Sequence, residues 1–280
     1  MTLQQSLLSS RNHDGGWPYY AGKTSRLEPT VWALLALHAA GERVSVDPLL
    51  GWPRRDGWFV DRSSDAVNVC FNALASIGLA ALAPDAPSRA ALAAALVAAR
   101  GVKLPQSSTN VQDNALQGWA WIDGTFSWVE PTAMALIALK RHRELSGAQA
   151  RIAEGERLLL DRVCRVGGWN YGNANVLGRQ LEPYTPPTAL ALMALRDHRD
   201  SEAVRRSQQH LSAHTLDERS GLALALTRVA LGVLDSPAST LAHALAEQWT
   251  RSAFLGNLHV TAVALYAEAA EPGGYEAFRV

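Results

Sequence analysis

Two kinds of helical pattern alternate along this chain. Residues 188–195 are apolar on every side and leave no polar position to face water. A helix of this kind must be enclosed by other helices. Residues 148–165 instead carry Ile152 and Leu159 on one side and Arg151 elsewhere, which is the pattern of a helix between a core and solvent. The alternation predicts an inner layer of apolar helices and an outer layer of amphipathic ones.

The apolar helices recur within a larger unit. Its most complete copy, residues 167–196, runs from a Gly-Gly-Trp turn through a polar loop into the helix. Glycine permits the tight turn, and proline is accepted in the first turn of the helix. Further copies are marked by Trp17, Trp58, Trp119, Ser220 and Asn257, of which the last two keep only the helix. A repeat of several tens of residues is typical of a stacked helical array.

The repeat predicts the architecture. About twelve helices of alternating character make roughly six hairpins of about 47 residues each. An open superhelix would expose both layers similarly, whereas here one helix of each pair is consistently more apolar. We therefore expect an all-α fold in which one closed double ring, a single domain, spans residues 1–280. The inner helices are expected to begin near Glu28, Asp65, Glu130, Pro186, Asp217 and Asn257.

Composition and charge limit the kinds of partner, and the cellular compartment, that we expect for this protein. The formal net charge is zero, so electrostatics give no reason to expect a nucleic acid partner. Cys70 and Cys164 fall on apolar helix faces and are expected to be buried, reduced thiols, which suits a cytoplasmic protein. Residues 1–11 lack the basic start and apolar core of a signal peptide. No uncharged apolar run reaches the about 20 residues that span a bilayer.

The glycine–tryptophan turns and the Pro-Thr-Ala helix starts resemble those of the prenyltransferase/squalene oxidase repeat family. This family includes squalene–hopene cyclases, oxidosqualene cyclases and protein prenyltransferase β subunits. The resemblance covers about residues 3–270, is strongest around Trp17, Trp119 and Trp169, and weakens after Ser201. It implies an (α/α)6 toroid that binds an isoprenoid in its central cavity. The motifs are specific for the fold and say less about activity.

Acidic residues at the expected helix starts are the candidate catalytic groups. In the similar squalene–hopene cyclases, an Asp-x-Asp-Asp-Thr-Ala motif supplies the acid that protonates an alkene. Aligning its Thr-Ala places Glu130 at that acid, with Pro131 and Trp128 at the other two Asp positions. Because so strong an acid needs partner donors, we expect no classical squalene cyclisation. Asp65 is the second candidate acid, and plain capping of helix N-termini is the alternative for both.

A metal site is not expected. The similar protein prenyltransferases hold zinc with an Asp-x-Cys pair and a later His. Here Asp65 and Cys70 are five residues apart and point to different faces of one helix, and His259 matches the later His only loosely. The ligand spacing that a zinc site requires is missing. We therefore expect neither a metal nor another cofactor.

Polar and aromatic side chains provide candidate binding residues. A polar stripe, spaced three or four residues apart on one helix face, consists of Asp65, Asn68, Asn72 and Ser76. Buried amides need partners, so this stripe either packs against polar groups of a neighbouring helix or lines a cavity. Aromatic faces bind isoprenoid chains and cations. The aromatic candidates are Trp32, Trp121, Trp128 and Tyr184.

Three classes of function remain at this point. The first is a toroid that binds an isoprenoid or another apolar small molecule in its central cavity. The second is a helical-repeat module that partners a separate enzyme, and the third is a divergent isoprenoid cyclase or transferase. The aromatic content and the incomplete acid motif favour the first class. The sequence leaves open a protein partner and a peripheral contact with a membrane.

Overall fold

The computed structural model describes residues 1–106, 111–236, 238–270 and 274–280. Helices dominate this part of the chain, so the all-α prediction is confirmed. The strands within it form two short antiparallel hairpins, β1 (Arg54–Arg55) with β2 (Trp58–Phe59) and β3 (Asn175–Val176) with β4 (Arg179–Gln180). Within the described ranges, no helix combines the length and the apolar character that a membrane crossing requires. Both cysteines are free and buried, as expected.

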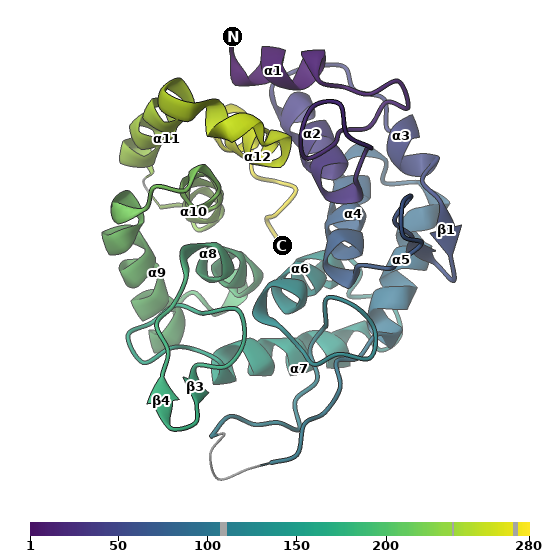
Figure 1. The fold of residues 1–280 in the computed structure, drawn as a ribbon. Helices are drawn as coiled ribbons and strands as arrows, with labels where there is room; N and C mark the ends of the chain where they lie inside the picture. Colours follow the sequence, from purple (N-terminus) through teal and green to yellow (C-terminus); the bar gives the residue numbers. More distant parts are fainter. Residues whose placement is uncertain (107–110, 237, 271–273) are drawn as a thin grey trace.

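Six helices form the inner layer and lie nearest the centre in Figure 1. They are α2 (Leu27–Ala39), α4 (Val69–Leu82), α6 (Val129–Lys140), α8 (Thr185–Ala194), α10 (Gly221–Val233) and α12 (Leu258–Ala269). Each contacts the next in this order, and α12 contacts α2, so the contacts close into a ring. These helices are buried on most sides because apolar residues occupy most of their positions.

The remaining α-helices lie outside this ring (Figure 1). They are α1 (Leu3–Ser9), α3 (Asp47–Leu50), α5 (Pro87–Ala98), α7 (Ala148–Asp161), α9 (Glu202–His214) and α11 (Ser239–Ser252). Most of them bury a single face; α9, for example, buries only Val204, Ser207 and Leu211. The division into apolar inner and amphipathic outer helices is therefore confirmed.

Each complete repeat is fastened by its turn tryptophan. The indole N–H of Trp169 donates to the carbonyl of Leu159 in the last turns of α7, at 2.7 Å. Its backbone N–H donates to the hydroxyl of Thr188 in α8, at 2.9 Å. Trp17 and Trp119 make the same pair of bonds in their own repeats. All three side chains are buried, so each turn joins an outer helix to the inner helix that follows it.

The loop after each of these turns also caps a neighbouring inner helix. The backbone N–H of a helix's first residue has no partner within the helix. In three inner helices, this N–H donates to the backbone carbonyl of the residue that lies two positions after a turn tryptophan. The pairs are Leu258 to Tyr19 (2.8 Å), Val69 to Trp121 (2.8 Å) and Val129 to Tyr171 (2.9 Å). The loops therefore join adjacent repeats at the end of the ring where the inner helices begin.

Two of the expected helix starts are wrong. α4 begins at Val69, and Asp65 lies in the preceding turn with a φ of +53°. The side chain of Asn68 caps α4, and that of Ser220 caps α10, which therefore begins later than the expected Asp217. Asn and Ser are strong N-cap residues because their short side chains reach the free backbone N–H groups. In both repeats such a residue lies closer to the apolar run than the acid does.

The last residues of the chain lie inside the ring, where Figure 1 marks the C-terminus. Phe278 is fully buried and stacks on Trp32, with 5.0 Å between the ring centroids. Tyr275 is also buried, and its hydroxyl donates to the carbonyl of Ala267 at 2.9 Å. Trp32 was one of the candidate binding residues. It is only 1% exposed, because the chain's own C-terminal segment packs against it.

Candidate functional site

A cluster of ionisable side chains lies at the end of the ring where the inner helices begin. The carboxylate of Glu28, in the first turn of α2, accepts a hydrogen bond from the hydroxyl of Tyr19. His259 Nε2 lies 3.6 Å from Glu28 Oε1. Glu130 on α6 and the thiol of Cys70 on α4 interact electrostatically with Glu28. Four inner helices thus bring together groups that are far apart in the sequence.

The environment of this cluster decides what its acids can do. Burial raises the pKa of Glu130 to about 7, and the nearby carboxylate of Glu28 acts in the same direction. Burial also raises the pKa of the Cys70 thiol well above its ordinary value. Glu130 can therefore exchange a proton near neutral pH. It is a weaker acid than an ordinary Glu, whereas protonation of an alkene requires a stronger one.

The polar stripe near α4 packs against protein groups. Asn72 is fully buried, and its amide accepts from the backbone N–H of Phe59 at 2.8 Å and donates to its carbonyl at 2.9 Å. Asn68 caps the first turn of α4. Asp65, a candidate acid, makes an exposed ion pair with Arg55 at 2.6 Å. The two amides therefore bind backbone groups of β2 and of the first turn of α4, instead of facing a cavity or packing against a neighbouring helix.

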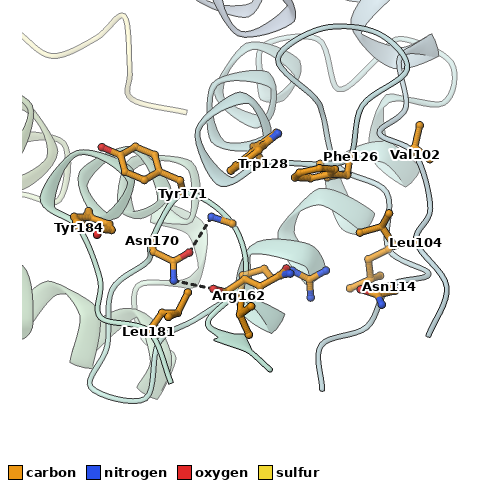
Figure 2. Close-up of a pocket in the computed structure, with 15 residues that line it drawn as sticks. Val102, Leu104, Asn114, Phe126, Trp128, Arg162, Asn170, Tyr171, Leu181 and Tyr184 are labelled. Carbon is orange, nitrogen blue, oxygen red and sulfur yellow. Dashed lines mark hydrogen bonds between the residues drawn. The ribbon is translucent and has the colours of Figure 1, made fainter. Parts of the chain in front are cut away.

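A pocket of about 360 Å³ lies near the start of α6. It lies between two parts of the connection that precedes α6, residues 102–104 and 114–128, and the segment 170–184 that precedes α8 (Figure 2). Its apolar lining consists of Val102, Leu104, Leu116, Phe126, Trp128, Tyr171, Val176, Leu181 and Tyr184. Two of the predicted binding residues, Trp128 and Tyr184, therefore meet at one pocket.

The other predicted residues lie elsewhere. Trp121 belongs to the same connection but packs edge-on against Phe71, with 6.1 Å between the ring centroids. Trp32 lies against Phe278, and Glu130 belongs to the ionisable cluster. The candidate residues predicted from the sequence therefore lie in separate environments.

Four aromatic rings form two pairs at the pocket (Figure 2). The ring centroids of Phe126 and Trp128 are 4.8 Å apart, and those of Tyr171 and Tyr184 are 5.3 Å apart. Trp128 and Tyr184 are the N-cap residues of α6 and α8, so the helix starts hold their rings in place. Phe126 and Tyr171 were not among the residues predicted from the sequence. The repeat offered a signal for Tyr171, which lies two residues beyond Trp169, but none for Phe126.

The polar side chains of the lining are those of Asn114, Ser127, Arg162, Asn170 and Asn173. The amide of Asn170 donates to the carbonyl of Asn173, and that of Asn114 to the carbonyl of Pro105, both at 2.8 Å. Arg162, the charged member of this group, is only 7% exposed. Burial lowers its pKa to about 10, so its guanidinium stays charged at neutral pH. The pocket therefore has apolar walls and one buried cation.

A second cavity, of about 370 Å³, shares Tyr184 with the first and has a more polar lining. His210 and His214 line it as a stacked pair with 4.2 Å between the ring centroids, together with Asp217 and Glu218. Burial and the neighbouring His214 lower the pKa of His210, which favours its neutral form. In the part of the chain that the structure describes, no group of three or more His, Cys, Asp or Glu is placed to hold a metal ion.

The pocket at Trp128 has the usual composition of a small-molecule site, with mostly apolar walls and few polar groups. The ionisable cluster around Glu28 and the polar cavity at His210 are separate features at the same end of the ring. In comparisons with known proteins, no family model and no curated sequence matches this chain.

Proposed function

We propose that this protein binds a small apolar molecule, such as an isoprenoid, in the pocket at Trp128 and Tyr184. One observation carries the proposal. Sixteen large apolar side chains are exposed in the described residues, and seven of them surround this pocket. They are Val102, Leu104, Phe126, Tyr171, Val176, Leu181 and Tyr184. Scattered exposed apolar residues are ordinary, whereas a contiguous group of them marks a binding surface.

The volume of the pocket limits the ligand. It is about 360 Å³, near the lower end of the range of roughly 300–1,000 Å³ for small-molecule sites. At roughly 30 Å³ for each heavy atom, the share of a water molecule in the liquid, such a pocket holds about a dozen atoms. A short isoprenoid or a chain of similar size fits this limit, and a triterpene such as squalene exceeds it.

The proposal is for binding without turnover. The raised pKa of Glu130 makes it a poor acid for an alkene, and Phe278 occupies part of the ring interior. A second candidate function is contact with a protein partner. It is favoured by Leu177, which is 74% exposed at the tip of the β3–β4 hairpin, next to the pocket residue Val176.

The test uses the neutral fluorescent probe N-phenyl-1-naphthylamine, whose naphthyl ring fits inside the pocket while its phenyl ring extends from the open side, with displacement by the C10 alcohol geraniol. We expect saturable binding of the probe and its displacement by geraniol. Phe126→Ala and Leu181→Ser should each weaken binding about tenfold, because a partly buried apolar contact is lost. Both side chains are exposed in the free protein, so their loss should leave folding intact.

Ile122→Ala is the matched control, since Ile122 is 49% exposed in the same connection and lies outside the pocket lining. It should bind the probe as the parent protein does. If no probe binds, or if all three variants bind equally well, the pocket is not the site. Stable capture of a protein through Leu177 without probe binding would then favour the second candidate.

A further inference from the structure

The buried cation of the pocket is unusual for a site with apolar walls. Arg162 follows α7 as its C-cap residue, and its side chain lines the pocket together with Asn114 and Asn170 (Figure 2). A charged group taken out of water is costly unless it is paired and hydrogen-bonded. The position of Arg162 therefore needs a physical reason, which is either a structural clamp or a role towards the ligand.

Part of the guanidinium is already engaged. One terminal nitrogen donates to the carboxylate of Asp161, and the other donates to the carbonyl of Asp113 at 3.2 Å. Asp161 also accepts from the backbone N–H of Asp113 at 3.1 Å, so its charge is shared between two donors. A guanidinium has five N–H groups. Within the described residues, two acceptors are found for Arg162.

Arg151, on α7, is a buried arginine whose terminal nitrogens meet more acceptors. The terminal nitrogens of Arg151 donate to three carbonyls and to the carboxylate of Glu154. Its guanidinium also lies over the ring of Trp119, 4.1 Å from the centroid. The pKa of both arginines is lowered to about 10 by burial. Arg162 differs in having fewer acceptors and in facing a cavity.

An anion at this position would complete the arginine's hydrogen bonds. Planar guanidinium groups bind carboxylates through two parallel N–H donors, and such charge-assisted bonds are stronger than neutral ones. Apolar walls strengthen the attraction because they exclude water. The neighbouring Asp161 and Asp113 oppose an anion, so the affinity depends on direct contact with the guanidinium.

We propose that the ligand is an amphipathic carboxylate, whose apolar chain lies against Trp128 and Tyr184 and whose carboxylate binds Arg162. The inference rests on the proposed function and adds the chemical class of the ligand. A chain of about ten carbons with one carboxylate matches the dozen or so heavy atoms that the pocket holds at roughly 30 Å³ each. The buried cation selects the acid over an alcohol or an amine of the same length.

The experiment compares three ligands of equal length as competitors of the neutral probe at pH 7.5: decanoate, 1-decanol and decylamine, each below its micellar concentration. In the parent protein, decanoate should displace the probe at a concentration about tenfold or more below that of decanol, as expected for a hydrogen-bonded charge. Decylamine should be the weakest of the three. This ranking requires no variant, so it stands even if a substitution at Arg162 prevents folding.

Arg162→Gln should remove the preference for decanoate and leave the displacement by decanol nearly unchanged. Arg165→Gln is the control, because Arg165 is exposed three residues away and should retain the preference. Equal affinity for the acid, the alcohol and the amine in the parent protein would overturn the inference and leave the proposed function intact. Equal weakening of all three ligands in Arg162→Gln would assign Arg162 to a structural clamp. Failure of every ligand and of the probe would contradict the proposed function itself.

Discussion

The exposure of aromatic side chains differs between the two ends of the ring. At the end where the inner helices terminate, the C-terminal segment enters the ring, and Phe278 is fully buried between Trp32 and Tyr266. At the other end, Phe126 packs against Trp128 but remains 42% exposed. The same kind of side chain therefore stabilises the fold at one end and is available to a ligand at the other.

The difference in exposure follows from which segment of the chain crosses each end of the ring. Arg279 fixes the C-terminal segment by donating to the carbonyl of Gly232 at 2.8 Å and pairing with Asp235 at 2.7 Å. Gly232 is required there, because a Cβ at this position would lie 1.9 Å from the ring of Tyr275. At the opposite end, loops join neighbouring repeats through backbone bonds, and some of their aromatic side chains, such as Phe126 and Tyr171, remain exposed. Where side chains fill one end of the ring, they form a core. Where backbone hydrogen bonds connect the loops at the other end, space remains for a pocket.

The largest loss of stability is expected from substitution of the turn tryptophan Trp169. In the described part of the chain, this residue packs neither against the C-terminal segment nor in the pocket. Trp169→Ala should destabilise the protein by about 3–5 kcal/mol, since a large buried ring is lost. Trp169→Phe keeps much of the packing and loses the bond to Leu159, so it should cost about 1–2 kcal/mol. Both are measured by chemical denaturation. Coincident unfolding curves for Trp169→Ala and the parent would show that the turn does not brace the repeat.

Truncation of the two phenylalanines tests the comparison directly. Phe278→Ala should lower the free energy of unfolding by about 3 kcal/mol, because a fully buried ring is removed. Phe126→Ala should change it by less than about 1 kcal/mol, as for other exposed positions, while weakening ligand binding. Denaturation of both variants under the same conditions is the measurement. Equal loss of stability at the two positions would mean that the ends do not differ as described.

The pH dependence of stability tests the ionisable cluster at the open end. The pKa of Glu130 is raised to about 7 in the folded protein, above its ordinary value of 4.5. Between these values the folded state holds a proton that the unfolded state has lost, so stability falls as pH rises from about 4.5 to 7. Glu130→Gln should remove this loss, which amounts to about 3 kcal/mol. If the parent and the variant show the same pH profile, Glu130 is more solvated than the structure indicates.

The smallest effect is expected at the tip of the hairpin beside the pocket. Leu177 has a φ of +52°, where the equivalent turn between β1 and β2 has Asp56 at +51°. Leucine is strained in this region, whereas Asn adopts it readily. Leu177→Asn should therefore stabilise the protein by about 0.5–1 kcal/mol. Asp56→Asn, the control, should have almost no effect; a loss of stability in Leu177→Asn would show that Leu177 contributes to packing.

The pattern of apolar positions was sufficient to predict the helical class and the order of the two layers. The apolar character of residues 188–195 by itself excludes a surface position, because a helix without a polar face must be enclosed. The Gly-Trp turn marked the repeat around Trp169, and the structure shows that its tryptophan joins α7 to α8. Two pocket residues, Trp128 and Tyr184, were also found, since the position just before an inner helix recurs in every complete repeat.

Only the tertiary structure decided which side chains share an environment. Asn72 was a candidate both for packing against a neighbouring helix and for lining a cavity, and its amide instead binds the backbone of Phe59 in β2, a contact across two elements. Trp32 is part of the core because Phe278, far away in the sequence, stacks on it. Arg162 resembles any other helix-end arginine in the sequence, and only the segments on both sides of it enclose it in a pocket. The periodicity of apolar positions predicts which way a side chain faces on its own helix. Contacts between distant segments depend on how the ring closes, and no local sequence pattern contains that information.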